Sequence, residues 1–328
     1  MKTKKYAGVV VPMVTPVNED GSLDTLAVER IITSFADNGV SPLLMGTTGE
    51  GNSVSRDDAL LLVETAVKAR SQWALLHGEC SMIVYVNLTG NCFSEQLKQA
   101  EAYTQAGADV ITATLPTYYA LTAEQMENYY RCLADNITGP LMLYNILATT
   151  HMSIPLDVIS RLADHPNIVG IKDSERDLER MEKCIDIARG RSDFAYFCGC
   201  AAHSARALEL GGDGIVPSTG NIEPGLYSML YEAAIAGNKK KACELQELTD
   251  RMGRVYQEGR TLGQSLAALK IVMETKNLCE PWMLLPLTRL SNKEEESIRR
   301  DYRLFTATEK IKLLKKIRAE LIELKGEE

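Results

Sequence analysis

Lys172 lies in the segment Gly170-Ile171-Lys172-Asp173-Ser174, at the end of a short apolar run. A lysine shielded by buried β-branched residues is disfavoured as an ammonium ion, and the neutral amine can attack a carbonyl carbon. The alternative interpretation is a lysine that extends from a strand end into solvent or pairs with Asp173. Taken alone, Lys172 favours this second interpretation.

Two further groups of residues favour a Schiff-base lysine. Tyr144 ends another apolar run, and a phenol beside a lysine can pass protons to and from a carbinolamine, the adduct that precedes an imine. The segment Gly46-Thr47-Thr48-Gly49-Glu50 puts small and hydroxylated residues at a strand-to-helix turn, where N–H groups and hydroxyls can bind a carboxylate. A core tyrosine and a purely structural turn are the alternatives, but a structural turn explains the paired threonines less well.

The elements that must position these residues alternate along the chain. Short apolar or β-branched runs, most of them followed by an amphipathic segment, predict parallel strands buried on both faces. Eight strand-helix units over roughly 220 residues are typical of a closed (β/α)8 TIM barrel, whose active site lies at the C-terminal ends of its strands. The expected strands are Gly8–Val14, Pro42–Met45, Ile83–Val86, Val110–Thr114, Leu141–Tyr144, Ile168–Ile171, Ala195–Cys198 and Gly214–Val216.

The strand pattern ends near residue 225, so we expect a barrel over residues 1–225 and a C-terminal helical region over residues 226–328. The helices expected in this region are Tyr227–Gly237, Lys239–Gln257, Ser265–Leu278 and Lys293–Leu324. The last one is amphipathic, which favours packing against the barrel or a sister subunit over a membrane-surface role. Among the helices expected earlier in the chain, one covers Asp57–Lys68.

Composition excludes several classes of function. The chain of 328 residues carries 36 Lys and Arg against 44 Asp and Glu, and a net charge of −8 disfavours a nucleic-acid partner. The apolar run from Gly8 to Val14 is too short, and too quickly broken by Pro12, for a signal peptide or membrane span. These features predict a cytoplasmic enzyme with no membrane partner.

Eight scattered cysteines without a C-x-x-C pair predict neither a disulfide framework nor a zinc ribbon. Cys198, Cys200 and His203 are close together in the sequence but lack a standard zinc spacing. We therefore expect no metal site.

In this order, the motifs resemble those of the dihydrodipicolinate synthase / N-acetylneuraminate lyase family, the class I pyruvate-dependent aldolases. The resemblance implies a TIM-barrel lyase that forms a covalent imine with a 2-keto acid, needs no cofactor, and assembles as a homodimer or homotetramer. It covers nearly the whole chain through the segments Val11–Pro16, Gly46–Glu50, Pro116–Tyr119, Leu143–Asn145, Gly170–Ser174, Gly214–Asn221 and Leu278–Pro286.

The resemblance also implies roles for single residues. Lys172 matches the imine-forming lysine, and Tyr144 matches the tyrosine that shuttles protons. Thr47 matches a residue that links this tyrosine to a second one, which often reaches into a neighbouring subunit's site. Tyr118 is the better match to that second tyrosine, and Tyr119 is a close competitor. The residues expected to bind substrate are Gly46, Thr48, Thr149, Ser174, Gly199 and Ile215, with the carboxylate on Thr47 and Thr48.

Two departures from the family pattern concern the second half of the pocket. Thr149 stands where synthases that make dihydrodipicolinate usually carry an arginine, five residues after the catalytic tyrosine, which holds the carboxylate of the aldehyde substrate. Ala201 and Ala202 follow Gly199 where neuraminate lyases place acidic residues for the sugar hydroxyls. The best-known substrates of the family are therefore both disfavoured. Thr149, Thr150, His151, Ser174, Cys200 and His203 are expected to line this half.

The resulting hypothesis is a Schiff-base-forming lyase or aldolase that acts on pyruvate or a 2-keto-3-deoxy sugar acid, with an aldehyde as the second reactant. The alternatives are 4-hydroxy-tetrahydrodipicolinate synthase, N-acetylneuraminate lyase, a dehydratase of keto-deoxy sugar acids, and a family member that binds keto acids without catalysis. Retention of Lys172, Tyr144 and Thr47 argues against the non-catalytic alternative.

Overall fold

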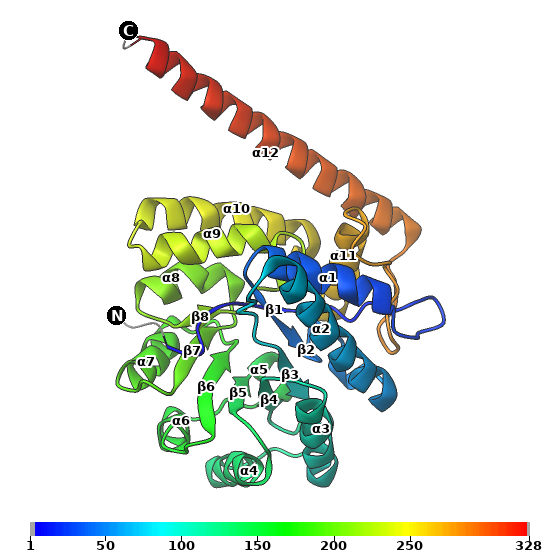
Figure 1. Ribbon diagram of the computed structural model, residues 1–328, viewed down its shortest axis with the longest axis vertical. Coiled ribbons are helices and arrows are strands. Elements are labelled where there is room, and N and C mark those ends of the chain that lie inside the picture. Colours follow the sequence, from blue (N-terminus) through cyan, green and yellow to red (C-terminus); the bar gives the residue numbers. More distant parts are fainter. Residues whose placement is uncertain (1–3, 327–328) are drawn as a thin grey trace.

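Eight parallel strands close into a barrel in chain order, β1 to β8 (Figure 1). The structure is a computed structural model that describes the backbone of residues 4–326 and the side chains of residues 4–309. The predicted TIM barrel is therefore confirmed. The strands are β1 (Gly8–Pro12), β2 (Ser41–Leu44), β3 (Tyr85–Leu88), β4 (Val110–Thr114), β5 (Leu141–Asn145), β6 (Ile168–Asp173), β7 (Ala195–Cys198) and β8 (Gly214–Ile215).

Helices surround the barrel and continue beyond it (Figure 1). The helices that follow the strands are α1 (Thr25–Asp37), α2 (Arg56–His77), α3 (Phe93–Gln105), α4 (Ala123–Asn136), α5 (Leu147–Thr150), α6 (Leu156–Leu162), α7 (Leu178–Arg189), α8 (Ser204–Glu209) and α9 (Pro224–Ile235). Three more helices follow, α10 (Lys239–Gln257), α11 (Leu262–Glu274) and α12 (Asn292–Gly326).

The C-terminal segments expected to be helical are helical, and Figure 1 shows α12 extending away from the barrel. Helix α11 begins with a capping box, in which Thr261 and Gln264 bond each other's backbone N–H groups. The division of the chain into two domains near residue 225 stays a prediction. Among the described residues, no helix is long and apolar enough to cross a membrane.

Several expected element bounds differ from the structure by a few residues, and the differences at α2 and β3 have clear physical reasons. Helix α2 continues past Lys68 to His77, because the added residues are mostly good helix formers; it ends at Gly78, whose φ of +100° suits glycine. Strand β3 begins at Tyr85 instead of Ile83. The N–H groups of Ile83 and Val84 bond the side chains of Ser41 and Asp109 instead of a neighbouring strand.

Side chains alternate between two cores along each strand. One core lies inside the barrel and includes Met142, Val169 and Phe197, and the other lies between the strands and the helices. Because Met142 faces the barrel interior, Tyr144 two residues later faces it too, and Asn145 faces the helices. The barrel therefore sets which residues can meet at its C-terminal end.

Candidate active site

Lys172 and Tyr144 are register partners on the neighbouring strands β6 and β5. Both side chains are almost fully buried, with 4% and 2% of their surfaces exposed. The Lys172 Nζ atom lies 3.7 Å from the centroid of the Tyr144 ring, above its face. The barrel therefore brings together the lysine and the tyrosine that the sequence singles out.

The alternative interpretations of Lys172 do not hold. The residue is buried and does not extend into solvent, and Asp173 pairs with Arg180, whose Nε lies 2.8 Å from Asp173 Oδ2. No described carboxylate forms an ion pair with Lys172. The Lys172 amine is therefore left to meet a carbonyl group of a substrate instead of a carboxylate of the described residues.

Thr47 meets Tyr144 from the loop that follows β2. Their hydroxyl oxygens lie 3.2 Å apart, although 97 residues separate them in the sequence. Thr48, beside Thr47, is buried. The loop is tightly turned, because a Cβ atom on Gly51 would lie 1.9 Å from the Met45 carbonyl oxygen. The Thr47 hydroxyl is consequently held against Tyr144, whose ring lies beside the Lys172 amine.

Tyr118 and Tyr119 are placed differently from Tyr144. Their rings contact each other edge to face at 4.9 Å, and 78% and 72% of their surfaces are exposed. Neither hydroxyl has a hydrogen-bond partner among the described residues, so a single chain does not link Thr47 to a second tyrosine. The aromatic pair is left open to solvent.

Other expected substrate-binding residues lie at the C-terminal ends of β6, β7 and β8. Ser174 lies against Gly199, where a Cβ atom would be 2.2 Å from Ser174 Oγ, so only glycine fits. Ile215 is fully buried in β8, and Gly46 is buried at the end of β2. Thr149 is half-buried in α5, a four-residue helix that the sequence did not predict.

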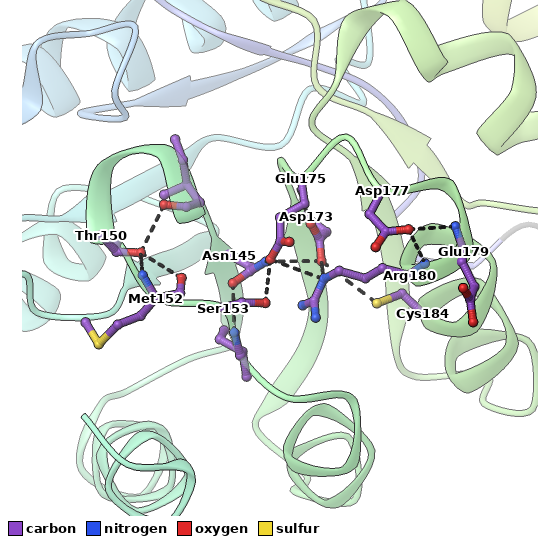
Figure 2. Close-up of polar contacts among 12 residues, drawn as sticks. Asn145, Thr150, Met152, Ser153, Asp173, Glu175, Asp177, Glu179, Arg180 and Cys184 are labelled. Atoms are coloured by element: carbon purple, nitrogen blue, oxygen red, sulfur yellow. Dashed lines mark hydrogen bonds and ion pairs between the residues drawn. The ribbon is translucent and has the colours of Figure 1, made fainter. Parts of the chain in front are cut away.

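A buried polar cluster lies on the outer face of β5 and β6, opposite the face that carries Lys172 and Tyr144. Figure 2 shows this cluster. Asn145 and Asp173 are register partners, and Asn145 Nδ2 donates to Asp173 Oδ2 at 3.2 Å and to Glu175 Oε1 at 2.7 Å. Arg180 contributes its guanidinium from α7, and the Ser153 hydroxyl donates to Glu175 at 2.6 Å. The cluster joins the ends of β5 and β6 to α7.

Burial governs the ionisation of the groups in this cluster. Desolvation raises the pKa of Asp173 above its usual value, although the Arg180 guanidinium opposes this rise. Burial also raises the pKa of the neighbouring Cys184 thiol to about 12, so this thiol stays protonated and unreactive.

Asn145 also fixes the loop between β5 and α6. Its Oδ1 atom accepts from the Ile154 N–H at 3.0 Å, and the Thr150 hydroxyl donates to the carbonyl groups of Ile146 and Met152. This loop includes Thr149, so the same side chain that joins the two strands also positions the expected pocket entrance. The sequence contained only one signal for this role, a polar residue that directly follows Tyr144.

Cys198, Cys200 and His203, which were considered for a metal site, do not form one in the structure. Cys198 is buried in β7, and its thiol donates to the Cys200 carbonyl oxygen at 3.4 Å. Burial raises the pKa of Cys198 to about 12, which disfavours the thiolate that a metal would need. Within residues 4–309, no group of three or more His, Cys, Asp or Glu side chains could hold a metal ion.

Comparison with known proteins extends these observations. The family model described as the dihydrodipicolinate synthetase family matches residues 5–303. A 4-hydroxy-tetrahydrodipicolinate synthase of Thiobacillus denitrificans is 31% identical over 294 residues, covering 89% of this chain and 94% of that relative. One from Nitrosomonas europaea is 30% identical over 296 residues, covering 90% and 97%.

Solved structures show the same architecture. The chloride-inhibited dihydrodipicolinate synthase from Acinetobacter baumannii, complexed with pyruvate, aligns with a TM-score of 0.80 at 26% identity and covers 92% of this chain and 99% of its own. YagE, a prophage protein from E. coli K12 in complex with pyruvate, aligns with a TM-score of 0.83 at 23% identity, with the same coverage. These likenesses agree with the closed barrel described above.

Proposed function

Since the chain belongs to the dihydrodipicolinate synthetase family, we propose that it is a Schiff-base-forming lyase of the class I aldolase type. Its substrate in this proposal is pyruvate or a 2-keto-3-deoxy sugar acid. The observation that carries the proposal is the buried Lys172 amine above the Tyr144 ring, with the Tyr144 hydroxyl 3.2 Å from Thr47. The proteins with which it shares this fold include a dihydrodipicolinate synthase that was solved in complex with pyruvate.

The chemistry follows from the properties of a neutral amine and a keto acid. The Lys172 amine adds to the C2 carbonyl, and loss of water from the carbinolamine gives a protonated imine. The protonated imine accepts the electron pair released when the C3–C4 bond breaks. The C4 hydroxyl loses its proton at the same time, and the fragment that contains C4 leaves as an aldehyde. The remaining enamine is protonated at C3, and hydrolysis returns pyruvate and the free amine. In the reverse direction the same steps form a carbon–carbon bond.

Tyr144 is the proposed proton carrier for these steps. Its hydroxyl is within hydrogen-bond distance of Thr47, so a proton can pass between them when the carbinolamine forms and loses water. Tyr118 is the proposed next residue in this relay, acting in a neighbouring subunit, because its exposed ring is free to enter another chain's pocket. Tyr119 is the alternative, and the chain is consequently proposed to be a homo-oligomer.

The carboxylate of the keto acid is proposed to bind at Thr47 and Thr48. Hydroxyl and backbone N–H groups in the compact loop after β2 can donate to both carboxylate oxygens. The pocket residues Ser174, Gly199 and Ile215 then enclose the imine, and Gly199 leaves the space that a side chain would fill.

The second substrate is proposed to be an aldehyde that carries no carboxylate, so that no cationic side chain is needed at the pocket entrance. The synthase activity named for the relatives is the second candidate function, supported by identity over nearly the whole chain. Thr149 argues against it, because a threonine cannot make the bidentate contact of an arginine. Lyase action on neuraminate and sugar-acid dehydration remain alternatives with the same imine.

The proposal needs no metal or cofactor, because the imine itself accepts the electrons. We also propose that the protein works in the cytoplasm, where thiols stay reduced, and all eight of its cysteines are free.

Exchange of the methyl protons of pyruvate in deuterated water tests the proposal without knowledge of the second substrate. The enamine forms only if the imine loses a methyl proton, so the wild type should catalyse exchange that NMR can follow. Tyr144→Phe should slow exchange by about 10²–10⁴-fold, the range for a lost general acid–base group. Tyr231→Phe, whose hydroxyl contacts the Asp213 carbonyl group elsewhere, is the control. Absence of exchange by the wild type would refute the proposal.

A further inference from the structure

Glu50 ends the loop that carries Thr47 and Thr48, and its side chain points away from the proposed chemistry into a fully buried ion pair. Glu50 Oε1 lies 2.6 Å from Lys270 Nζ, and the two side chains are 0% and 1% exposed. Lys270 belongs to α11, far from Glu50 in the sequence. A pair buried this deeply is costly to form and strongly disrupted when one partner is removed.

The contacts of this pair reach a third segment of the chain. Glu50 Oε2 accepts from the Leu284 N–H at 2.8 Å, and Lys270 Nζ donates to the Trp282 carbonyl oxygen at 2.7 Å. Both groups belong to the connector between α11 and α12. The ion pair therefore joins the loop after β2, helix α11 and this connector at one buried point.

The loop conformation makes Glu50 an effective anchor. Glu50 has a φ of +54°, a left-handed conformation that is uncommon for residues other than glycine. Its own N–H bonds the Thr47 carbonyl group, so a shift of Glu50 is passed to Thr47 directly. On the other side of the loop, the Thr15 hydroxyl donates to the Gly49 carbonyl group. The loop is held at one side by the barrel and at the other by the C-terminal helices.

We propose that the Glu50–Lys270 pair positions the carboxylate-binding loop, so that α11 and its connector set the affinity of the site for keto acids. The inference rests on the proposed function, because it assigns carboxylate binding to Thr47 and Thr48. Glu50 and Lys270 are positioning residues: they contact the loop and not the substrate. The C-terminal helices are then part of the construction of the active site.

The test measures the pyruvate concentration at half-maximal borohydride trapping and the rate of methyl exchange at saturation. In Glu50→Gln, the carboxylate charge is lost and the shape is kept. We expect the half-saturating concentration to rise about tenfold or more, with exchange at saturation within about threefold of the wild type. Glu274→Gln is the matched control, because Glu274 pairs with Arg299 on α12 from the other end of α11.

The double variant Glu50→Leu/Lys270→Met separates positioning from folding. Replacing both charges by apolar groups avoids an unpaired buried ion, so the double variant should unfold at a higher urea concentration than Lys270→Met. Leucine cannot accept the Leu284 N–H, so weak binding should persist. Three results would overturn the inference. The first is a wild-type half-saturating pyruvate concentration in the double variant, and the second is an unchanged half-saturating concentration in folded Glu50→Gln. The third is loss of folding in both Glu50→Gln and the double variant. Absence of trapping in the wild type would instead refute the proposed function.

Discussion

Thr149 is the residue on which the proposed choice of second substrate depends most. The imine chemistry needs Lys172, Tyr144 and Thr47, and these residues lie together in the barrel. The identity of the second substrate is proposed to depend on groups further out, where Thr149 is half-buried in α5. A hydroxyl there can bind a neutral polar group but adds no charge for a second carboxylate.

Introducing an arginine at this position should change the substrate preference. Thr149→Arg should lower the KM for an aldehyde that carries a carboxylate, such as aspartate semialdehyde, by about one to two decades, because a charge-assisted hydrogen bond contributes about 1.5–3 kcal/mol. Steady-state kinetics with pyruvate and the aldehyde measures this, and Thr149→Met adds a long side chain without charge as a control. Efficient use of the aldehyde by the wild type would show that the arginine is not needed.

The strand register explains why the catalytic pair and the buried polar cluster occur together. On β5 and β6, the pairing of Tyr144 with Lys172 on the inner face requires the pairing of Asn145 with Asp173 on the outer face. The outer pair is joined to α7 through Arg180 (Figure 2). It is joined to the next loop through the Ile154 N–H, which donates to Asn145 Oδ1. Strands β5 and β6 are therefore held by polar contacts of Asn145 and Asp173, the residues that directly follow Tyr144 and Lys172.

Breaking this cluster should destabilise the protein. Arg180→Met leaves Asp173 buried without its ion-pair partner, which should lower the free energy of unfolding by about 3–5 kcal/mol. Urea denaturation followed by circular dichroism measures the change. Lys183→Met, on the same helix but in an exposed pair with Glu179, should have little effect. Equal stability of the two variants would show that the cluster does not hold the strands.

Sequence patterns predicted the elements better than the contacts between them. Buried apolar runs and helix caps are local signals, so β4 and β7 begin and end at the predicted residues. The short helix α5 has too few residues for a periodic pattern to be visible. The bond between Glu50 and the Leu284 N–H joins residues 234 positions apart, and no spacing rule predicts such a contact.

At the scale of the whole molecule, a single chain leaves the proposed proton relay incomplete. Tyr144 and Thr47 are joined, but Tyr118 and Tyr119 are exposed and have no hydrogen-bond partner among the described residues. An oligomer in which one chain supplies this tyrosine to its neighbour would complete the relay and cover the exposed rings.

Mixed oligomers test this arrangement. Lys172→Ala and Tyr118→Phe should each be nearly inactive in the exchange of pyruvate methyl protons. When equal amounts of the two variants are unfolded and refolded together, about half of the dimers should be mixed. One of the two sites in each mixed dimer combines an intact lysine with an intact tyrosine, so about a quarter of all sites should be active. No recovery despite mixed oligomers would show that Tyr118 does not serve a neighbouring site; the same test with Tyr119→Phe identifies the tyrosine used.

Lys172 is proposed to form the imine, and covalent trapping detects this bond itself. The protein is incubated with pyruvate, reduced with borohydride, digested and mapped by mass spectrometry. We expect one reduced pyruvate adduct, on the peptide that contains Lys172, and no adduct in Lys172→Arg. An adduct on another lysine, or none in the folded wild type, would contradict it.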